Sequence, residues 1–172
     1  LSLQHGDDMI LKRMKRRHSR GDALAFVEQV RRLRPEISLG ADMIAGFPTE
    51  TEDMFDNARR LAEEARIAHL HVFPYSPRPG TPAARMPQLD RALVKERAAR
   101  LRETGATLYA AHLNAMTGTR QTILVENNGL AHTENFTLVV AEGLGPGALV
   151  PVTITGHNGK HLTMQVQRPQ AA

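Results

Sequence analysis

Three stretches of the sequence combine polar side chains with small or turn-forming residues, and loops of this kind often carry binding sites. Ala45 and Gly46 would let a flat ligand approach the backbone closely. Asp42 could accept hydrogen bonds from a sugar diol, or it could be an ordinary structural acceptor within a strand. The three stretches are residues 4–7, 42–51 and 73–82.

Other chemistry is less well supported by the side chains available. Asp42 and Glu50 could form an acid/base pair only if their carboxylates converge within roughly 5–10 Å. His69 and His71 share one face of a strand, but no third ligand lies nearby in the sequence, so we predict no metal site. The chain has no cysteine, which excludes disulfides and thiolate-bound clusters within these 172 residues. We therefore predict no catalytic residue here.

The elements that must position these loops alternate between strand and helix. Ser19 and Asp22 resemble a capping box, and Thr49 or Thr51 can cap a helix that ends near Ala65. Residues 37–47 carry little charge, which suits a strand buried on both faces. The predicted strands are 1–4, 37–47 and 69–75, and the other predicted helices are 8–18, 20–34 and 90–116.

Beyond Gly118 the pattern changes to short strands separated by Asn-Gly and Gly-Pro-Gly turns. Five such strands in about fifty residues favour a small β-barrel. The sequence thus predicts an α/β domain over residues 1–118 and an all-β domain over 119–172. The five predicted strands are 119–126, 130–133, 136–140, 149–155 and 162–166.

Parallel strands joined by helical crossovers form a barrel or an open sheet, and three strands cannot close a barrel. With Leu1 in place of Met, we expect the chain to be a fragment of a larger protein. We expect one parallel sheet with a bare inner face, and an unpaired edge at residues 1–4. Another chain would cover these surfaces, either the N-terminal half of the same protein or a second copy in a homodimer.

Positive charge is concentrated in the first domain, and the net charge is +4. Residues 1–118 hold 19 of the 22 lysines and arginines and 15 of the 18 acids. No apolar run approaches the roughly 20 residues of a membrane span, so we expect a cytoplasmic protein without membrane contact. One dense basic run is either a solvated helix face or a surface for RNA. It comprises Lys12, Arg13, Lys15, Arg16, Arg17 and Arg20.

Several of these stretches together resemble the methylthiotransferase branch of the radical S-adenosylmethionine enzymes. The family's motifs correspond here to residues 11–16, 42–51 and 75–83, with Thr49 where glycine is commoner. Residues 131–136 are similar to the Thr-x-Asn-aromatic segment of the family's TRAM module, with Ala131 where glycine is usual. The resemblance implies half of a radical-SAM TIM-like barrel with parallel strands, followed by a TRAM barrel of the OB-like type.

Residues 71–76 and 84–86 look most like the subgroup that acts on N6-threonylcarbamoyladenosine beside the tRNA anticodon. The alternatives are the isopentenyladenosine and ribosomal-protein subgroups, or a stand-alone RNA-binding module without catalysis. The implied reaction adds a methylthio group at adenine C2. It uses S-adenosylmethionine and two 4Fe–4S clusters in the full-length protein, and we expect none of them bound to this fragment alone.

The resemblance also implies roles for individual residues. Lys12 is a second candidate beside Arg13 for pairing with the cofactor's carboxylate, and Phe136 could stack on a base or lie in the barrel core. The expected partner is the anticodon arm of a tRNA. The candidates for cofactor binding are Gln4, Arg13, Asp42, Gly46 and Tyr75, and those for RNA binding are Lys12, Lys15, Arg16, Arg78, His132 and Phe136.

Overall fold

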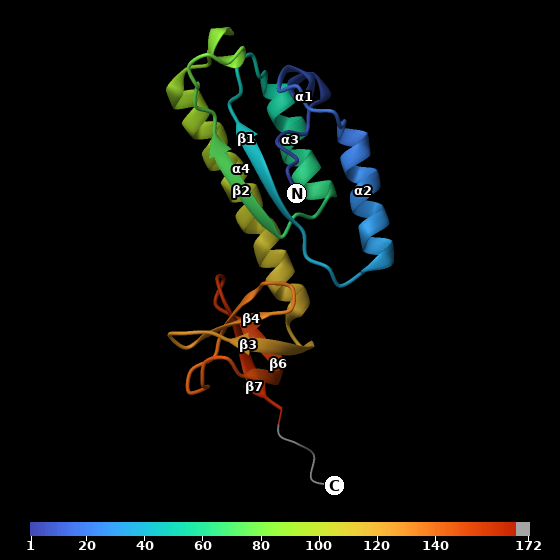
Figure 1. Cartoon of the computed structure of the whole chain (residues 1–172), viewed down its shortest axis with the longest axis vertical. Coiled ribbons are helices and arrows are strands. Elements are labelled where there is room, and N and C mark those ends of the chain that lie inside the picture. Colours follow the sequence, from blue (N-terminus) through green and yellow to red (C-terminus); the bar gives the residue numbers. More distant parts are fainter. Residues whose placement is uncertain (168–172) are drawn as a thin grey trace. The chain divides into compact units, whose positions relative to one another are not determined.

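The computed structural model describes residues 1–167, which divide into two compact units. The first unit comprises Leu1–Tyr109 and mixes helices with parallel strands, and the second begins at Ala110 and is mainly β (Figure 1). Within residues 1–167, no helix has both the length and the apolar character that crossing a membrane requires.

The sheet of the first unit is parallel. Strand β1 (Gly40–Ala45) pairs with β2 (His69–Pro74) in a register that runs from Gly40 opposite His69 to Ala45 opposite Pro74. Residues 1–4 lie on the other side of β1 and form an isolated parallel bridge between Gln4 and Met43. The predicted order of the three segments is therefore confirmed. The first is not a regular strand, since Gln4 has a φ of 66° and the chain turns there.

Three α-helices, one short 3-10 helix and the part of a fourth α-helix up to Tyr109 complete the first unit. Helix α1 is shorter than the predicted 8–18, because Lys15 adopts a φ of 58° and ends the helix in a Schellman motif. The N–H of Lys15 donates to the carbonyl of Lys12, and the N–H of Arg16 donates to the carbonyl of Leu11. The capping box of Ser19 and Asp22 is confirmed. The elements are α1 (Asp8–Arg13), α2 (Arg20–Leu33), α3 (Glu52–Glu64), η1 (Ala83–Arg85) and α4 (Arg91–Met116).

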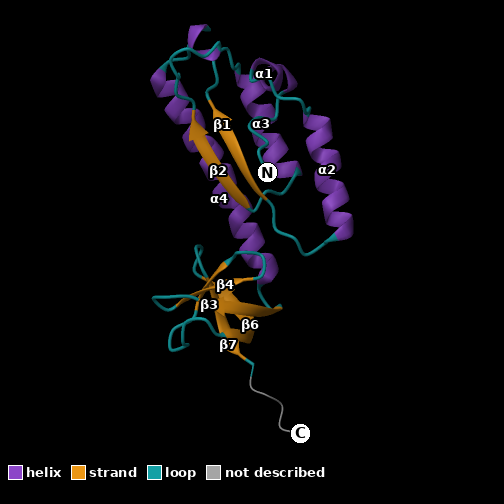
Figure 2. Cartoon of the chain, in the orientation of Figure 1, coloured by secondary structure: helices purple, strands orange, loops and turns teal. Residues whose placement is uncertain are grey.

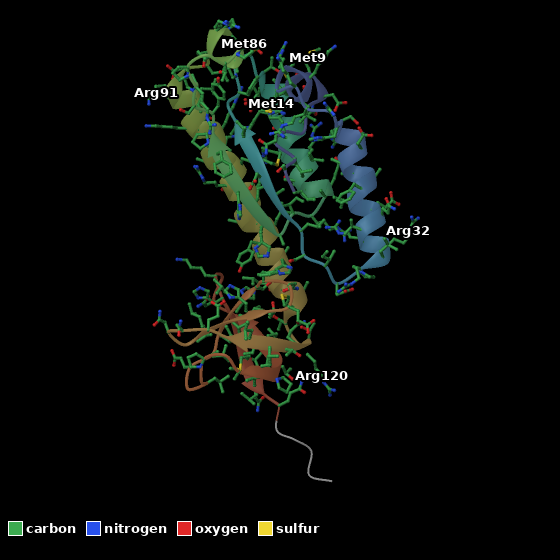
Figure 3. The ribbon with its side chains drawn as sticks, viewed as in Figure 1. Met9, Met14, Arg32, Met86, Arg91 and Arg120 are labelled. Atoms are coloured by element: carbon green, nitrogen blue, oxygen red, sulfur yellow. The ribbon has the colours of Figure 1, made fainter. Side chains whose placement is uncertain are left out.

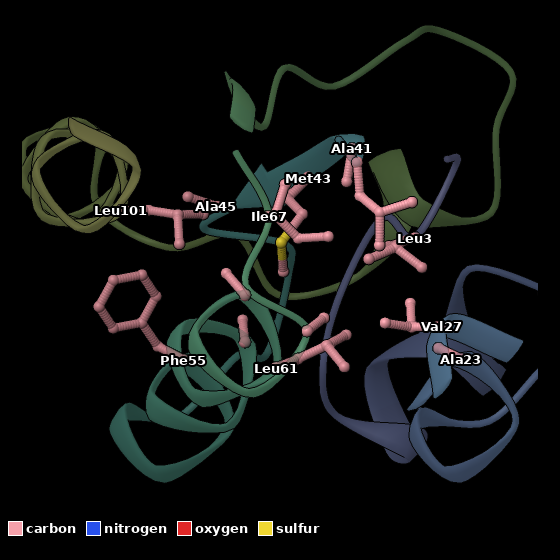
Figure 4. Close-up of a cluster of buried hydrophobic side chains, with 14 of the residues drawn as sticks. Leu3, Ala23, Val27, Ala41, Met43, Ala45, Phe55, Leu61, Ile67 and Leu101 are labelled. Atoms are coloured by element: carbon pink, nitrogen blue, oxygen red, sulfur yellow. The ribbon is translucent and has the colours of Figure 1, made fainter. Parts of the chain in front are cut away.

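The helices of the first unit cover one face of the sheet. Along β1, buried and half-buried residues alternate, so that Ala41, Met43 and Ala45 face the helices while Asp42 and Ile44 face away. The prediction that this strand is buried on both faces is therefore wrong for the described residues. The hydrophobic core that results includes Val27, Met43, Phe55, Leu61 and Leu101 (Figure 4).

The second unit contains a closed five-stranded barrel, as the sequence predicted (Figure 2). Its strands follow one another around the barrel in the order β3-β4-β5-β7-β6. Inward-facing Ile123, Val139 and Val152 are fully buried. The strands are β3 (Arg120–Val125), β4 (Leu130–Thr133), β5 (Leu138–Val140), β6 (Leu149–His157) and β7 (Leu162–Val166).

Candidate functional site

The polar loops singled out in the sequence follow the carboxyl ends of the three parallel segments of the first unit. Residues 4–7 follow the first segment, 46–51 follow β1 and 75–82 follow β2. Because the segments are parallel, their carboxyl ends lie at the same edge of the sheet, where ligands bind in open and closed α/β folds. The tertiary structure thus brings three distant loops to one edge.

A buried cluster of charged and polar side chains ties two of these loops to α4. The Nε2 atom of His5 lies 2.9 Å from Oε2 of Glu50, and Nη1 of Arg97 donates to Oε1 of Glu50 at 2.8 Å. The amide N–H of Asp7 donates to Nδ1 of His5, so the imidazole carries its proton on Nε2 and donates it to Glu50. All three members of the cluster, His5, Glu50 and Arg97, are at least 97% buried.

The backbone of the loop after β1 takes part in the same cluster. The amide N–H of Gly46 lies 3.2 Å from both carboxylate oxygens of Glu50, and Arg97 also donates to the carbonyl of Glu50 at 2.9 Å. Glu50 is therefore fully occupied as an acceptor beneath the loop. Asp42 lies on the opposite face of β1, so the acid/base pairing of Asp42 with Glu50 has no support in the structure.

The cluster extends to the surface through a second acid. Glu52 receives hydrogen bonds from Arg97 and Arg100, and the bond from Arg100 is the main cause that lowers the pKa of Glu52 below its ordinary value. Both guanidinium groups lie over the ring of Phe55, at 5.5 and 4.8 Å from its centre. Sequence reasoning included His5 only as part of the stretch 4–7, without a role of its own, and missed Arg97. The signal was available for Arg97, because it follows buried Val94 by three residues in a helix.

The sheet face that points away from the helices carries a second histidine–carboxylate pair. Nδ1 of His71 lies 3.2 Å from Oδ1 of Asp42, and the two residues are register partners on β2 and β1. Their side chains are 68% and 45% exposed, respectively. The next register pair on this face is Ile44 and Phe73, and Phe73 is 53% exposed. Within residues 1–167, this face of the sheet is thus accessible to solvent.

The predicted cofactor residues lie around the same edge. The backbone N–H of Gln4 donates to the backbone carbonyl of Asp42 at 2.8 Å, so these two candidates are neighbours. The ring of Tyr75 packs edge-on against Phe47 at 5.3 Å. Within residues 1–167 its buried hydroxyl has no hydrogen-bond partner, and burial raises the pKa of Tyr75.

Gly46 and Arg13 have structural contacts that the sequence did not indicate. Gly46 has a φ of 77°, and a Cβ atom there would lie 2.8 Å from the side chain of Val94. Arg13 donates to Oγ1 of Thr49 at 2.7 Å, and Thr49 itself has a φ of 68°, which is rare for a β-branched residue. This contact links the end of α1 to the loop after β1.

The two neighbouring histidines of β2 differ in environment. His69 lies 5.4 Å from the ring of Tyr109, and burial, followed by the proximity of His71, lowers the pKa of His69. Over residues 1–167, no three His, Asp or Glu side chains are grouped in a way that could hold a metal ion.

The basic RNA candidates of the first unit are at the surface. Lys12, Lys15 and Arg16 are exposed at the end of α1, and none of them forms a salt bridge with another described residue. Arg78 is exposed in the loop after β2. Other basic side chains, such as Arg32 and Arg91, also extend from the ends of helices (Figure 3).

In the second unit, Phe136 lies in a tight turn and is 80% exposed, so it is not part of the barrel core. Its φ is 62°, and the turn is fixed by bonds of Thr133 and Thr137 to Oδ1 of Asn135 at 2.6 and 3.0 Å. The structure therefore holds an aromatic ring in solvent in an unfavoured backbone conformation. His132, the other candidate here, pairs with Glu126 at 3.0 Å.

Comparison with known proteins gives the class to which this chain belongs. It is 55% identical over 136 residues to the threonylcarbamoyladenosine tRNA methylthiotransferase MtaB of Rickettsia prowazekii, covering 79% of this chain and 32% of that protein. It is 37% identical over 163 residues to MtaB of Treponema pallidum, covering 92% of this chain and 34% of the relative. No family model matches the chain.

A third relative carries a different substrate in its name. The chain is 37% identical over 169 residues to the tRNA-2-methylthio-N(6)-dimethylallyladenosine synthase of Corynebacterium urealyticum, covering 90% of this chain and 31% of the relative. The chain thus belongs to the MtaB- and MiaB-type tRNA methylthiotransferase family. It spans about a third of the length of the curated relatives that it matches.

Proposed function

We propose that this chain is part of a tRNA methylthiotransferase that adds a methylthio group at C2 of N6-threonylcarbamoyladenosine beside the anticodon. The observation that carries the proposal is the 55% identity over 136 residues to a relative named for that substrate. The arrangement of the polar loops at one edge of a parallel sheet supports it, since that edge is where such folds bind their ligands. In this proposal the first unit belongs to a radical-SAM barrel and the second is a TRAM domain.

The residues at the sheet edge fit S-adenosylmethionine. Oδ2 of Asp42 has no hydrogen-bond partner among the described residues and could accept from a ribose hydroxyl. The side chain of Gln4, the carbonyl of Gly46 and the unpartnered hydroxyl of Tyr75 would supply further polar contacts, and Arg13 would pair with the carboxylate. S-adenosylmethionine and two 4Fe–4S clusters would supply the radical and sulfur chemistry. The cysteines that hold the clusters would belong to the rest of the protein.

RNA binding would combine charge with stacking. Lys12, Lys15, Arg16 and Arg78 are exposed cations that can neutralise phosphates. Phe136 offers a solvent-facing ring to a base, and stacking of this kind contributes about 1–3 kcal/mol per base. An exposed aromatic ring in a strained turn has a stability cost without a folding benefit, which supports a role in binding.

Mass spectrometry of tRNA from a strain that lacks the full-length gene tests the proposal. We expect loss of the methylthio group from threonylcarbamoyladenosine, with the unmethylthiolated nucleoside accumulating in its place. Loss of the methylthio group from isopentenyladenosine instead would assign the protein to that subgroup, whose name one relative carries. A change in a ribosomal protein with normal tRNA would assign it to the third subgroup.

The exposed Phe136 also favours a second candidate, an RNA-binding module without catalysis. That module would bind RNA through the same turn, and deletion of the gene would leave every methylthiolated nucleoside unchanged. The presence of the strand-edge loops and their buried supporting cluster favours the enzyme, since RNA binding by the barrel has no need of them.

A further inference from the structure

His71, which pairs with Asp42, is the strongest feature of the open sheet face that has no assigned role. The two side chains come from neighbouring strands at one register position, and Nδ1 of His71 lies 3.2 Å from Oδ1 of Asp42. Both are accessible to solvent, and the helices of the unit pack on the opposite face. A ligand that lies on this face would meet His71 directly.

The pair contributes little to folding but defines the orientation of the imidazole. Exposed ion pairs have a small effect on stability, because solvent screens them and two side chains must be ordered. With Nδ1 held by the carboxylate, Nε2 lies on the far side of the ring. When the imidazole is protonated, Nε2 donates a charge-assisted hydrogen bond, which is the interaction that a carboxylate ligand accepts best.

The neighbouring residues supply a surface for the rest of such a ligand. Ile44 and Phe73 lie on the same face, two residues farther along their strands, which is about 6.6 Å. Phe73 is more than half exposed and offers an aromatic surface to a flat heterocycle. A nucleobase at Phe73 would thus place a substituent several bonds long near His71.

We propose that His71 determines substrate specificity by binding the carboxylate of the threonylcarbamoyl group on the target adenosine, with Asp42 orienting the ring. The inference rests on the function proposed above and names a residue within it. Two relatives are named for threonylcarbamoyladenosine, whose substituent ends in a carboxylate, and the third is named for dimethylallyladenosine, whose substituent is a hydrocarbon. The imidazolium form of His71 would donate to the carboxylate and would find no acceptor on the hydrocarbon, so it would discriminate between these two groups.

The test uses the whole methylthiotransferase and two fluorescent anticodon stem-loop RNAs. One carries threonylcarbamoyladenosine and the other carries dimethylallyladenosine at the same position. For His71→Gln, we expect affinity for the first RNA to fall roughly tenfold or more and affinity for the second to stay within about twofold. His71→Lys supplies a cationic donor and should retain most of the discrimination. His161→Gln, a histidine in the β6–β7 turn, serves as the matched control and should change neither affinity.

Several outcomes would overturn the inference. An equal loss for both RNAs would make His71 a general RNA contact, and no loss for either would remove it from the site. Weaker S-adenosylmethionine binding in equilibrium dialysis, with unchanged RNA discrimination, would assign His71 to the cofactor. If His71→Gln keeps full discrimination while the wild-type protein methylthiolates threonylcarbamoyladenosine, only the inference fails. If the wild-type protein neither binds nor methylthiolates the RNA, the proposed function fails with it.

Discussion

The first unit contains the same chemical pair, a histidine and a carboxylate, in two opposite environments. His5 and Glu50 are buried among packed helices and receive further hydrogen bonds from Arg97 and from the backbone of Gly46. His71 and Asp42 lie on the open face of the sheet with no such support. The buried pair holds the loops in position, and the exposed pair is available to a ligand. Burial, rather than residue type, separates the two roles.

Removing the charge of the buried carboxylate should have the largest effect. In Glu50→Gln, Arg97 loses its buried partner and keeps only the half-exposed carboxylate of Glu52, so the free energy of unfolding should fall by about 3 kcal/mol. Urea denaturation measures the free energy of unfolding of this variant and of a matched control. The matched control is Asp42→Asn on the exposed pair, which should change stability by less than about 1 kcal/mol. Similar losses in both variants would contradict the distinction between the pairs.

The loop that covers the buried pair should tolerate no extra atom at Gly46. In Gly46→Ala, the new Cβ would lie 2.8 Å from Val94, and the positive φ adds its own cost, giving a loss of about 3 kcal/mol. Gly80 has a similar φ of 82° but no heavy atom within 4 Å, so Gly80→Ala should cost about 1 kcal/mol. The difference between the two unfolding energies isolates packing, and equal costs would show that backbone strain alone matters.

In the second unit, Phe136 is another exposed side chain that a ligand can reach. Phe136→Ala should weaken tRNA binding by about 1–3 kcal/mol if the ring stacks on a base. The melting temperature should stay close to the wild-type value, because the side chain is 80% exposed. Filter binding beside thermal melting measures both quantities. A variant that binds tRNA like the wild-type protein would remove Phe136 from the interface.

The smallest effect should come from the half-buried histidine of β2. The pKa of His69 is lowered in the folded protein, chiefly by burial, so the unfolded chain takes up a proton first as the pH falls. Its contribution to stability is therefore present above pH 6.5 and is lost as the pH falls through the lowered folded-state pKa. His69→Asn should give a shallower fall in stability between pH 7 and 5, measured by urea denaturation. His71→Gln should retain most of the slope, since burial is the larger cause of the shift.

Local sequence signals determined much of the secondary structure. The capping box of Ser19 and Asp22 started α2 where expected, because its hydrogen bonds join residues three apart. The strands of the barrel follow turns whose glycine and asparagine residues are equally local signals. The sequence predicts α1 to end at residue 18, but the helix ends at Arg13, because a lysine in the left-handed conformation at position 15 has no clear sequence signature. The family, too, was identified from motifs that need no tertiary structure.

Only the tertiary structure decided which polar residues of those motifs are buried. Asp42 and Glu50 lie eight residues apart in one motif, yet one faces solvent and the other bonds to His5 and Arg97, which are 45 and 47 residues away along the chain. The sequence likewise left open whether Phe136 lies in the barrel core or at the surface, and the tertiary structure places it at the surface. Burial depends on which distant segments pack together, whereas helix caps and turns depend on bonds between near neighbours.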